Sequence, residues 1–159
     1  MSKQDQVTIQ QAGFERITEA RTLFQEYAAS LDFALCFQSF DQELASLPGK
    51  YAPPQGRLLL AECGGRLSGC VALRRLDDEI CEMKRLFVRP EFRGKGVGRL
   101  LAERVIEQAR GIGYQRMRLD TVPSSMAKAV AMYRELGFVE IAPYCVNPVE
   151  GALYFERLL

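Results

Sequence analysis

Two very short turns between strand-like segments place the strongest constraint on how this chain folds. Residues 58–63 and 67–75 are rich in apolar side chains and are separated by Gly64 and Gly65, the composition that a two-residue hairpin favours. Asp77 and Asp78 then precede a third strand-like segment, 80–89. Connections of this length cannot hold a crossover, so the three segments are predicted to be neighbouring antiparallel strands.

Helical patterns occupy the segments on either side of these strands. Apolar residues recur at helical spacing over 17–31, and 97–109 repeats the pattern before the glycines at 111 and 113. A capping box that begins at Ser39 predicts a short helix towards Leu47. A further helix is predicted over 124–136, with Gly137 as its end.

The remaining strand-like segments complete a mixed pattern. They are 7–10, 116–122 and two short runs within 138–159. Because 116–122 follows a strand and a helix, it is predicted to lie parallel to 80–89. The chain is therefore expected to form an α/β fold with a mixed sheet, antiparallel first and parallel later, and helices on both faces. No repeat or linker divides it, so we expect one domain over 1–159.

Composition narrows the classes of function. Hydrophobic residues make up 48% of the chain and charged residues 26%, as in a folded globular protein. The net charge of +1, from 21 basic and 20 acidic side chains, offers no general attraction for nucleic acid. No apolar run approaches the roughly 20 residues that a membrane helix needs, and no signal peptide is evident, so a cytoplasmic location is expected.

Histidine is absent, and this limits the chemistry. Mechanisms that need an imidazole base are excluded, and a metal site of the usual Cys/His type is not expected. The cysteines at 36, 63, 70, 81 and 145 show no CxxC spacing. They are expected to be reduced thiols, mostly buried as small hydrophobic groups.

The segment 93–99, Arg-Gly-Lys-Gly-Val-Gly-Arg, lies where a strand ends and a helix begins. The first N–H groups of a helix lack internal partners and attract anions, and glycine lets the backbone approach a phosphate closely. The spacing does not match a P-loop, and Arg99 stands where a dinucleotide fingerprint needs its third glycine. A phosphate site is one interpretation of this loop, and a solvated basic turn is the other.

Three motifs in order extend this interpretation. The loop resembles the [Q/R]-x-x-G-x-[G/A] signature of the GCN5-related N-acetyltransferase (GNAT) family. Residues 82–90 resemble the strand that precedes the signature in this family. Ala129, Tyr133, Gly137 and Phe138 resemble the family's last helix and the strand after it. With the order of elements, the resemblance covers nearly the whole chain.

The resemblance implies a sheet whose fourth and fifth strands splay apart around acetyl-CoA. The pantetheine arm would pair with the backbone of Leu86, Phe87 and Val88, where an N–H would also serve as oxyanion donor. The pyrophosphate would bind Arg93, Gly94, Lys95, Gly96, Val97, Gly98 and Arg99. A primary amine would attack the thioester directly in a ternary complex, so acetyl transfer needs positioning and proton transfer.

Two side chains are the catalytic candidates that the resemblance implies. Tyr133 matches the tyrosine whose hydroxyl approaches the CoA sulfur, with a packed aromatic residue as the alternative. Glu82 stands where some members carry a catalytic base, although it could instead pair with Lys84 on the same strand face, and a water chain could replace it. Cys81 is expected to serve packing. Met126 departs from the asparagine that many members have at this position.

The acceptor is expected to be a small amine bound by the first two helices, the loop at Pro53 and Pro54, and the tail near Asn147. The aromatic candidates are Tyr27, Phe33, Phe37 and Tyr144. Arg74 and Arg75 either face a carboxylate on the acceptor or are solvated at a strand end. A second copy of the chain is kept as a candidate partner.

Two rival functions remain open. A non-catalytic acyl-CoA-binding or sensing module would keep the fold and bind acetyl-CoA without releasing thiol. A nucleotide-binding regulator would prefer ATP or NAD to CoA.

Overall fold

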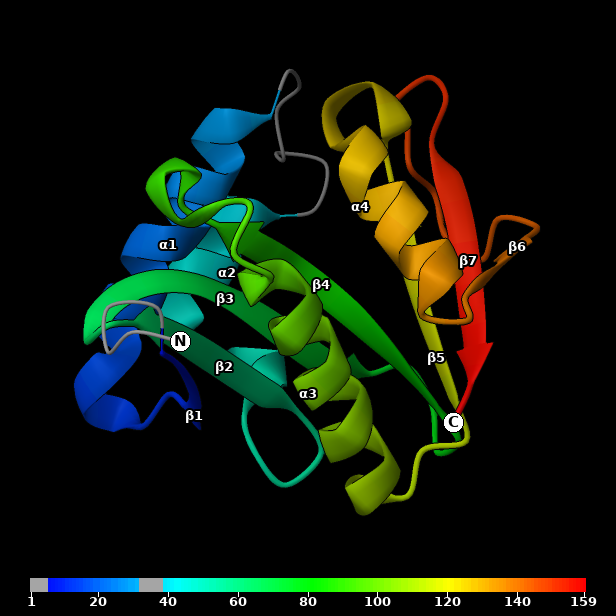
Figure 1. The fold of residues 1–159 in the computed structure, drawn as a ribbon. Helices are drawn as coiled ribbons and strands as arrows, with labels where there is room; N and C mark the ends of the chain where they lie inside the picture. Colours follow the sequence, from blue (N-terminus) through cyan, green and yellow to red (C-terminus); the bar gives the residue numbers. More distant parts are fainter. Residues whose placement is uncertain (1–5, 32–38) are drawn as a thin grey trace.

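The computed structural model of the protein describes residues 6–31 and 39–159, with the backbone alone at 124–126. Within these residues, seven strands form one mixed sheet in the order β1-β2-β3-β4-β5-β7-β6 (Figure 1). The strands are β1 (Val7–Gln11), β2 (Arg57–Cys63), β3 (Arg66–Arg75), β4 (Ile80–Val88), β5 (Arg116–Thr121), β6 (Val139–Ile141) and β7 (Leu153–Leu158).

The predicted meander of β2, β3 and β4 is confirmed. Gly64 and Gly65 both have positive φ, at 59° and 80°, which is the backbone that a tight hairpin requires and that glycine adopts without strain. Each strand pairs antiparallel with the next, and β1 adds to the outer edge of β2. The parallel pairing of β4 with β5 is also confirmed.

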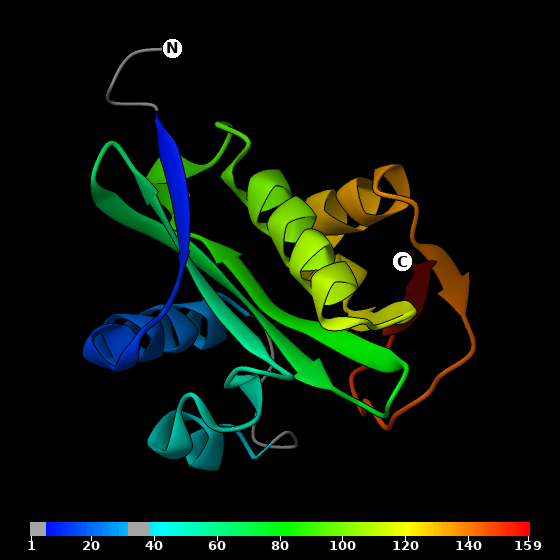
Figure 2. The same ribbon diagram turned by 90° about the horizontal axis from the view of Figure 1, so that it is seen from below.

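Helices cover both faces of the sheet, as predicted. Figure 2 shows α1 (Ile17–Ser30) and α2 (Phe40–Ser46) on one face, and α3 (Val97–Ile112) and α4 (Pro123–Glu135) on the other. Three short 3-10 turns complete the described elements: η2 (Phe14–Arg16), η4 (Gly49–Tyr51) and η5 (Pro90–Phe92). No helix of the described ranges is both long and apolar enough to cross a membrane.

Alternation along the strands divides the core into two parts. In β2, Leu58 and Leu60 pack beneath α1 and α2, whereas Leu59 and Ala61 pack against α3. All four are almost completely buried. The period of two in a strand therefore supplies both cores from one continuous apolar run.

Two features of β4 open the sheet beside it. Parallel pairing with β5 involves only Ile80, Cys81 and Glu82, so the edge of β4 that faces β5 has no strand partner beyond Glu82. Between the pairs Cys70–Phe87 and Ala72–Lys84, β4 also holds one residue more than β3. This β-bulge contains Arg85 at φ 60°, a value that non-glycine residues seldom adopt.

One detail differs from the prediction. Ser39 is not the cap of a capping box, because its φ of 54° and ψ of 43° are left-handed and its side chain makes no cap bond, whereas a capping serine is extended. The two short strands expected in the tail are confirmed as β6 and β7, and β7 lies between β5 and β6, antiparallel to both.

Candidate functional site

A cavity of about 480 Å³ lies where β4 and β5 separate. We call it the β4–β5 cavity. Its lining comes from β4, the loop before α3, the start of α3, the end of β5 and one side of α4. Most of the residues that the sequence singled out line it: Leu86, Phe87, Val88, Arg93, Gly94, Gly96, Val97, Gly98, Arg99 and Tyr133.

The glycines of the loop shape one end of this cavity. Gly94 and Gly96 have φ of 80° and 78°, so a side chain at either position would strain the turn. No side chain caps α3, whose first N–H groups therefore keep their capacity to bind an anion. A Cβ on Gly98 would lie 3.5 Å from Cγ2 of Val88, which shows how closely α3 approaches β4.

The basic side chains of the loop differ in position. Arg93 lines the cavity and donates from Nε to the carbonyl oxygen of Val88 at 3.1 Å. Arg99 also lines it, and bonds Glu103 at 3.1 Å and Glu135 at 2.8 Å. Lys95 belongs to the same loop but is not part of the cavity lining. Two of the three predicted cations therefore face this space.

The edge of β4 forms the wall opposite β5. Leu86, Phe87 and Val88 line the cavity, and Phe87 and Val88 pair with β3 on their other side. Because β5 has diverged at this level, the backbone groups on the cavity side of the edge meet no strand. Apart from the carbonyl oxygen of Val88, which accepts from Arg93, they are available to a ligand that lies along β4.

Tyr133 reaches the cavity from α4. Its ring packs edge-to-face on Phe138, with centroids 5.8 Å apart, and only 6% of the residue is exposed. Burial raises the pKa of Tyr133, so the hydroxyl keeps its proton at neutral pH. Within 6–31 and 39–159 the hydroxyl has no hydrogen-bond partner, although it lines the cavity.

Glu82 lines a second cavity, of about 340 Å³, which lies beneath α2 and η4. We call it the α2 cavity. Lys84, Arg85 and Asp120 line both cavities and so form their common wall. Tyr133 and Glu82 therefore line two neighbouring cavities and not the same cavity.

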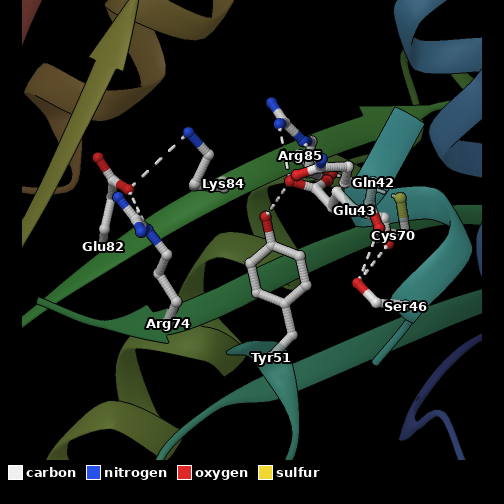
Figure 3. A network of polar contacts seen from close by, with 9 residues as sticks. All are labelled: Gln42, Glu43, Ser46, Tyr51, Cys70, Arg74, Glu82, Lys84 and Arg85. Atoms are coloured by element: carbon white, nitrogen blue, oxygen red, sulfur yellow. Dashed lines mark hydrogen bonds and ion pairs between the residues drawn. The ribbon is translucent and has the colours of Figure 1, made fainter. Parts of the chain in front are cut away.

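The carboxylate of Glu82 is buried and held on both oxygens. Arg74 donates from Nε to Oε1 at 2.7 Å, and the hydroxyl of Tyr144 donates to Oε2 at 2.5 Å (Figure 3 shows the arginine). The ammonium of Lys84 is farther away, with Nζ 3.8 Å from Oε1. The predicted pairing with Lys84 is thus present, but Arg74 is the closer partner because it stands opposite Glu82 in β3.

Sequence reasoning missed a second network on the same cavity. Glu43 of α2 accepts two bonds from Arg85, at 2.8 and 3.0 Å, and one from the hydroxyl of Tyr51, at 2.9 Å. Asp120, which also escaped notice, accepts a bond from Asn147 at 3.0 Å. Arg85 carries a signal in the sequence, because it is a charged residue at a position that the alternation of its strand makes apolar. Asp120 and Glu43 carry no such signal.

The segments that were expected to bind the acceptor do not line one common cavity. Tyr27 lines the β4–β5 cavity, whereas Pro53 and Pro54 line a separate depression with Arg75. Arg74 is not a solvated arginine at a strand end. Only 26% of its side chain is exposed, and it forms an ion pair with Glu82. Phe33, Phe37, Cys36 and the side chain of Met126 lie outside the described residues.

Cys81 does not have the surroundings of a nucleophile. Cys81 is fully buried and donates its thiol to the carbonyl oxygen of Arg116. Burial raises the pKa of Cys81 to about 12, so the thiolate is absent at neutral pH. This agrees with the packing role expected for it.

Comparison with known proteins agrees with this geometry. Residues 17–138 match the model of the acetyltransferase (GNAT) family. An uncharacterized N-acetyltransferase of Schizosaccharomyces pombe is 39% identical over 142 residues, which cover 88% of this chain and 86% of the relative. A GNAT-family acetyltransferase of Staphylococcus aureus has the same fold, with a TM-score of 0.79, 18% identity and coverage of 96% and 99% of the two chains. A candidate acetyltransferase of Salmonella typhimurium, solved with its cofactor acetyl-CoA, matches with a TM-score of 0.68, 22% identity and coverage of 96% and 93%. The chain therefore belongs to the GNAT acetyltransferase family.

Proposed function

We propose that the protein transfers the acetyl group of acetyl-CoA to a primary amine of a small molecule. The observation that carries the proposal is the β4–β5 cavity, which joins an anion-binding helix start, an unpaired strand edge and a tyrosine hydroxyl. The Salmonella typhimurium structure with acetyl-CoA supports the choice of cosubstrate.

The chain's own groups fit the parts of acetyl-CoA. The backbone at 94–98 and the guanidinium groups of Arg93 and Arg99 would bind the pyrophosphate, because oriented N–H groups and arginine both suit phosphate oxygens. The backbone edge at 86–88 would hold the pantetheine arm and donate to the carbonyl oxygen of the acetyl group. When bound, acetyl-CoA supplies an acetyl group that is already activated as a thioester.

Two proton positions complete the proposal. The hydroxyl of Tyr133 keeps its proton and would give it to the leaving sulfur. On the acceptor side, Glu82 or a water chain would take the proton of the amine. Asp120 is a further candidate, since it lines both cavities and thus the path from the acceptor to the thioester.

The first test is calorimetric titration with acetyl-CoA, with ATP and NAD as controls. We expect selective binding of acetyl-CoA, and binding at least tenfold weaker when Arg93 and Arg99 are both changed to Ala, since each charge-assisted bond contributes about 1.5–3 kcal/mol. The matched control changes Arg104 and Arg110 to Ala, which removes two charges of α3 that do not line the cavity. Equal affinity in all three proteins would remove the loop from the mechanism.

Release of CoA thiol then separates the rival functions. Thiol release with an amine supports the enzyme. Tight binding without release from any amine would favour an acyl-CoA sensor, and preference for ATP or NAD would favour a nucleotide-binding regulator.

A further inference from the structure

The α2 cavity is lined by charged side chains of both signs, with an excess of one positive charge. Its cations are Lys50, Arg74, Lys84 and Arg85, and its carboxylates are Glu43, Glu82 and Asp120. The cavity volume, about 340 Å³, suits a small organic molecule. If the proposed function holds, this space beside the cosubstrate is where the acceptor binds, and its charges identify the class of acceptor.

Arg74 offers an unused hydrogen-bonding edge to this cavity. Its Nε is held by Glu82 at 2.7 Å, which orients the guanidinium. The two terminal nitrogens have no acceptor among the residues that the structure describes. Every fully buried side-chain nitrogen or oxygen of the described residues has a hydrogen-bond partner. Since these two nitrogens have none, they are not fully buried. A guanidinium edge of this kind matches a carboxylate in two parallel bonds.

Arg85 places a second guanidinium group on the other side of Tyr51. Nε and one terminal nitrogen bind Glu43, while the aromatic rings of Tyr27 and Phe40 lie 5.8 and 5.3 Å from the guanidinium carbon. The hydroxyl of Tyr27 is a further hydrogen-bond partner of Arg85, which lines both cavities. Figure 3 shows Tyr51 between the Arg74–Glu82 pair and the Arg85–Glu43 pair. The two guanidinium groups are therefore fixed before any ligand binds.

The carboxylates of this cavity do not occupy the terminal nitrogens of Arg74. Glu82 already accepts from Arg74 and from Tyr144, and both oxygens of Glu43 are bound to Arg85. Asp120 differs, because it lies on the wall shared with the β4–β5 cavity, where an attacking amine must pass. The ammonium group of a ligand would therefore be attracted to Asp120, and an anionic group of the same ligand would be attracted to Arg74.

We propose that the acceptor is an amine that also carries a carboxylate, and that Arg74 binds this carboxylate. The excess of one positive charge corresponds to a single carboxylate rather than to a doubly charged phosphate. Polyamines are disfavoured, because their second cation would meet Arg74 and Arg85. The proposal rests on the proposed function for the role of the cavity, and on the two arginines for its chemistry.

The test compares matched acceptors by CoA thiol release. The panel contains the common L-amino acids, the α-amide and the decarboxylated amine of each, aminomethylphosphonate with glycine as its partner, and spermidine. We expect at least one amino acid to be acetylated, with a catalytic efficiency at least tenfold above that of its amide and its amine. Equal or higher efficiency with an amide, an amine, the phosphonate or spermidine would overturn the proposal.

Variants locate the effect. Arg74→Gln is expected to lower the catalytic efficiency for the amino acid at least tenfold more than that for its amide, mainly through KM, because only the amino acid loses a bond to its carboxylate. Arg75→Gln is the matched control, since Arg75 lies on the next residue of β3 and pairs with the surface carboxylate of Asp78. An equal loss for both acceptors in Arg74→Gln would show a structural role and refute the assignment. If Arg74→Gln fails to fold, Lys50→Gln at the exposed rim replaces it, with a severalfold rise in KM expected for the amino acid alone.

A binding measurement separates this proposal from the proposed function. Amino acids and their amides are titrated into the protein saturated with CoA. Preferential binding of an amino acid without thiol release would support the carboxylate site while contradicting the transferase. Thiol release from neutral amines, together with no binding of amino acids, would support the transferase and refute the carboxylate site.

Discussion

Gly69 of β3 gives a direct test of how the edge of β4 is positioned. It pairs with Val88, and a Cβ added to Gly69 would lie 2.5 Å from the carbonyl oxygen of Phe87 and 3.3 Å from Cδ1 of Leu101. The first contact is roughly 1 Å shorter than the separation at which nonbonded atoms attract most strongly. Gly69→Ala must therefore push β4 away from β3, at the residues that line the β4–β5 cavity.

The expected magnitudes follow from this overlap. Overpacking of a filled core costs about 1–3 kcal/mol, so the free energy of unfolding in urea should fall by that amount. A displacement near 1 Å at a binding edge reduces catalytic efficiency by up to about a hundredfold, and we expect a loss of about ten- to hundredfold for acetyl-CoA.

A second glycine supplies the control. A Cβ on Gly111, near the end of α3, would meet no atom within 4 Å. Gly111→Ala should therefore stabilise the protein by up to about 1 kcal/mol, through its better helix propensity, and leave catalysis unchanged. The reasoning is refuted if Gly69→Ala matches the wild type in both urea unfolding and kinetics, or if both variants change in the same direction.

Three further outcomes are expected. Tyr133→Phe should lower kcat for thiol release about 10²–10⁴-fold while calorimetry shows nearly unchanged affinity for acetyl-CoA, and full activity would exclude the hydroxyl as the acid. Glu43→Gln should lower the free energy of unfolding by about 3–5 kcal/mol, because Arg85, with 2% of its side chain exposed, loses a buried anionic partner; a urea midpoint equal to that of the wild type would contradict this. Burial raises the pKa of Cys81 from 9 to about 12, so the folded thiol keeps a proton that the unfolded chain loses. The resulting stabilisation is complete below pH 9 and is lost as the pH rises from 9 to 12, by at most about 1.4 kcal/mol per pH unit. Urea unfolding over this range should show a shallower decline for Cys81→Ala, and identical slopes would contradict the assignment.

Features set by neighbouring residues were predictable from the sequence. The hairpin at Gly64 and Gly65 and the helix start after Gly96 depend on glycines that adopt positive φ within a few residues of the element they begin or end. The residues that line the β4–β5 cavity were largely predictable too, because one end of the cavity is formed by a single continuous segment, 93–99.

Features set by long-range pairing were not predictable. The bulge at Arg85 places an arginine at positive φ, and the side chain is held by Glu43, which lies 42 residues earlier in the chain. A pair of Glu82 with Lys84 was one of the interpretations that the strand period left open, whereas the register with β3 brings Arg74 closer. The alternation of a strand does not tell where a bulge falls, or which residue of the neighbouring strand stands opposite.

The separate origins of the two cavity linings have a consequence for how this protein can be altered. Among the described residues that line the β4–β5 cavity, none comes from 39–51, the segment that holds α2 and η4 and forms much of the α2 cavity. Exchange of this segment between relatives would thus replace one wall of the α2 cavity and retain the helix start, the strand edge and Tyr133. If the proposed roles of the two cavities hold, such an exchange would change the acceptor and keep the site for acetyl-CoA.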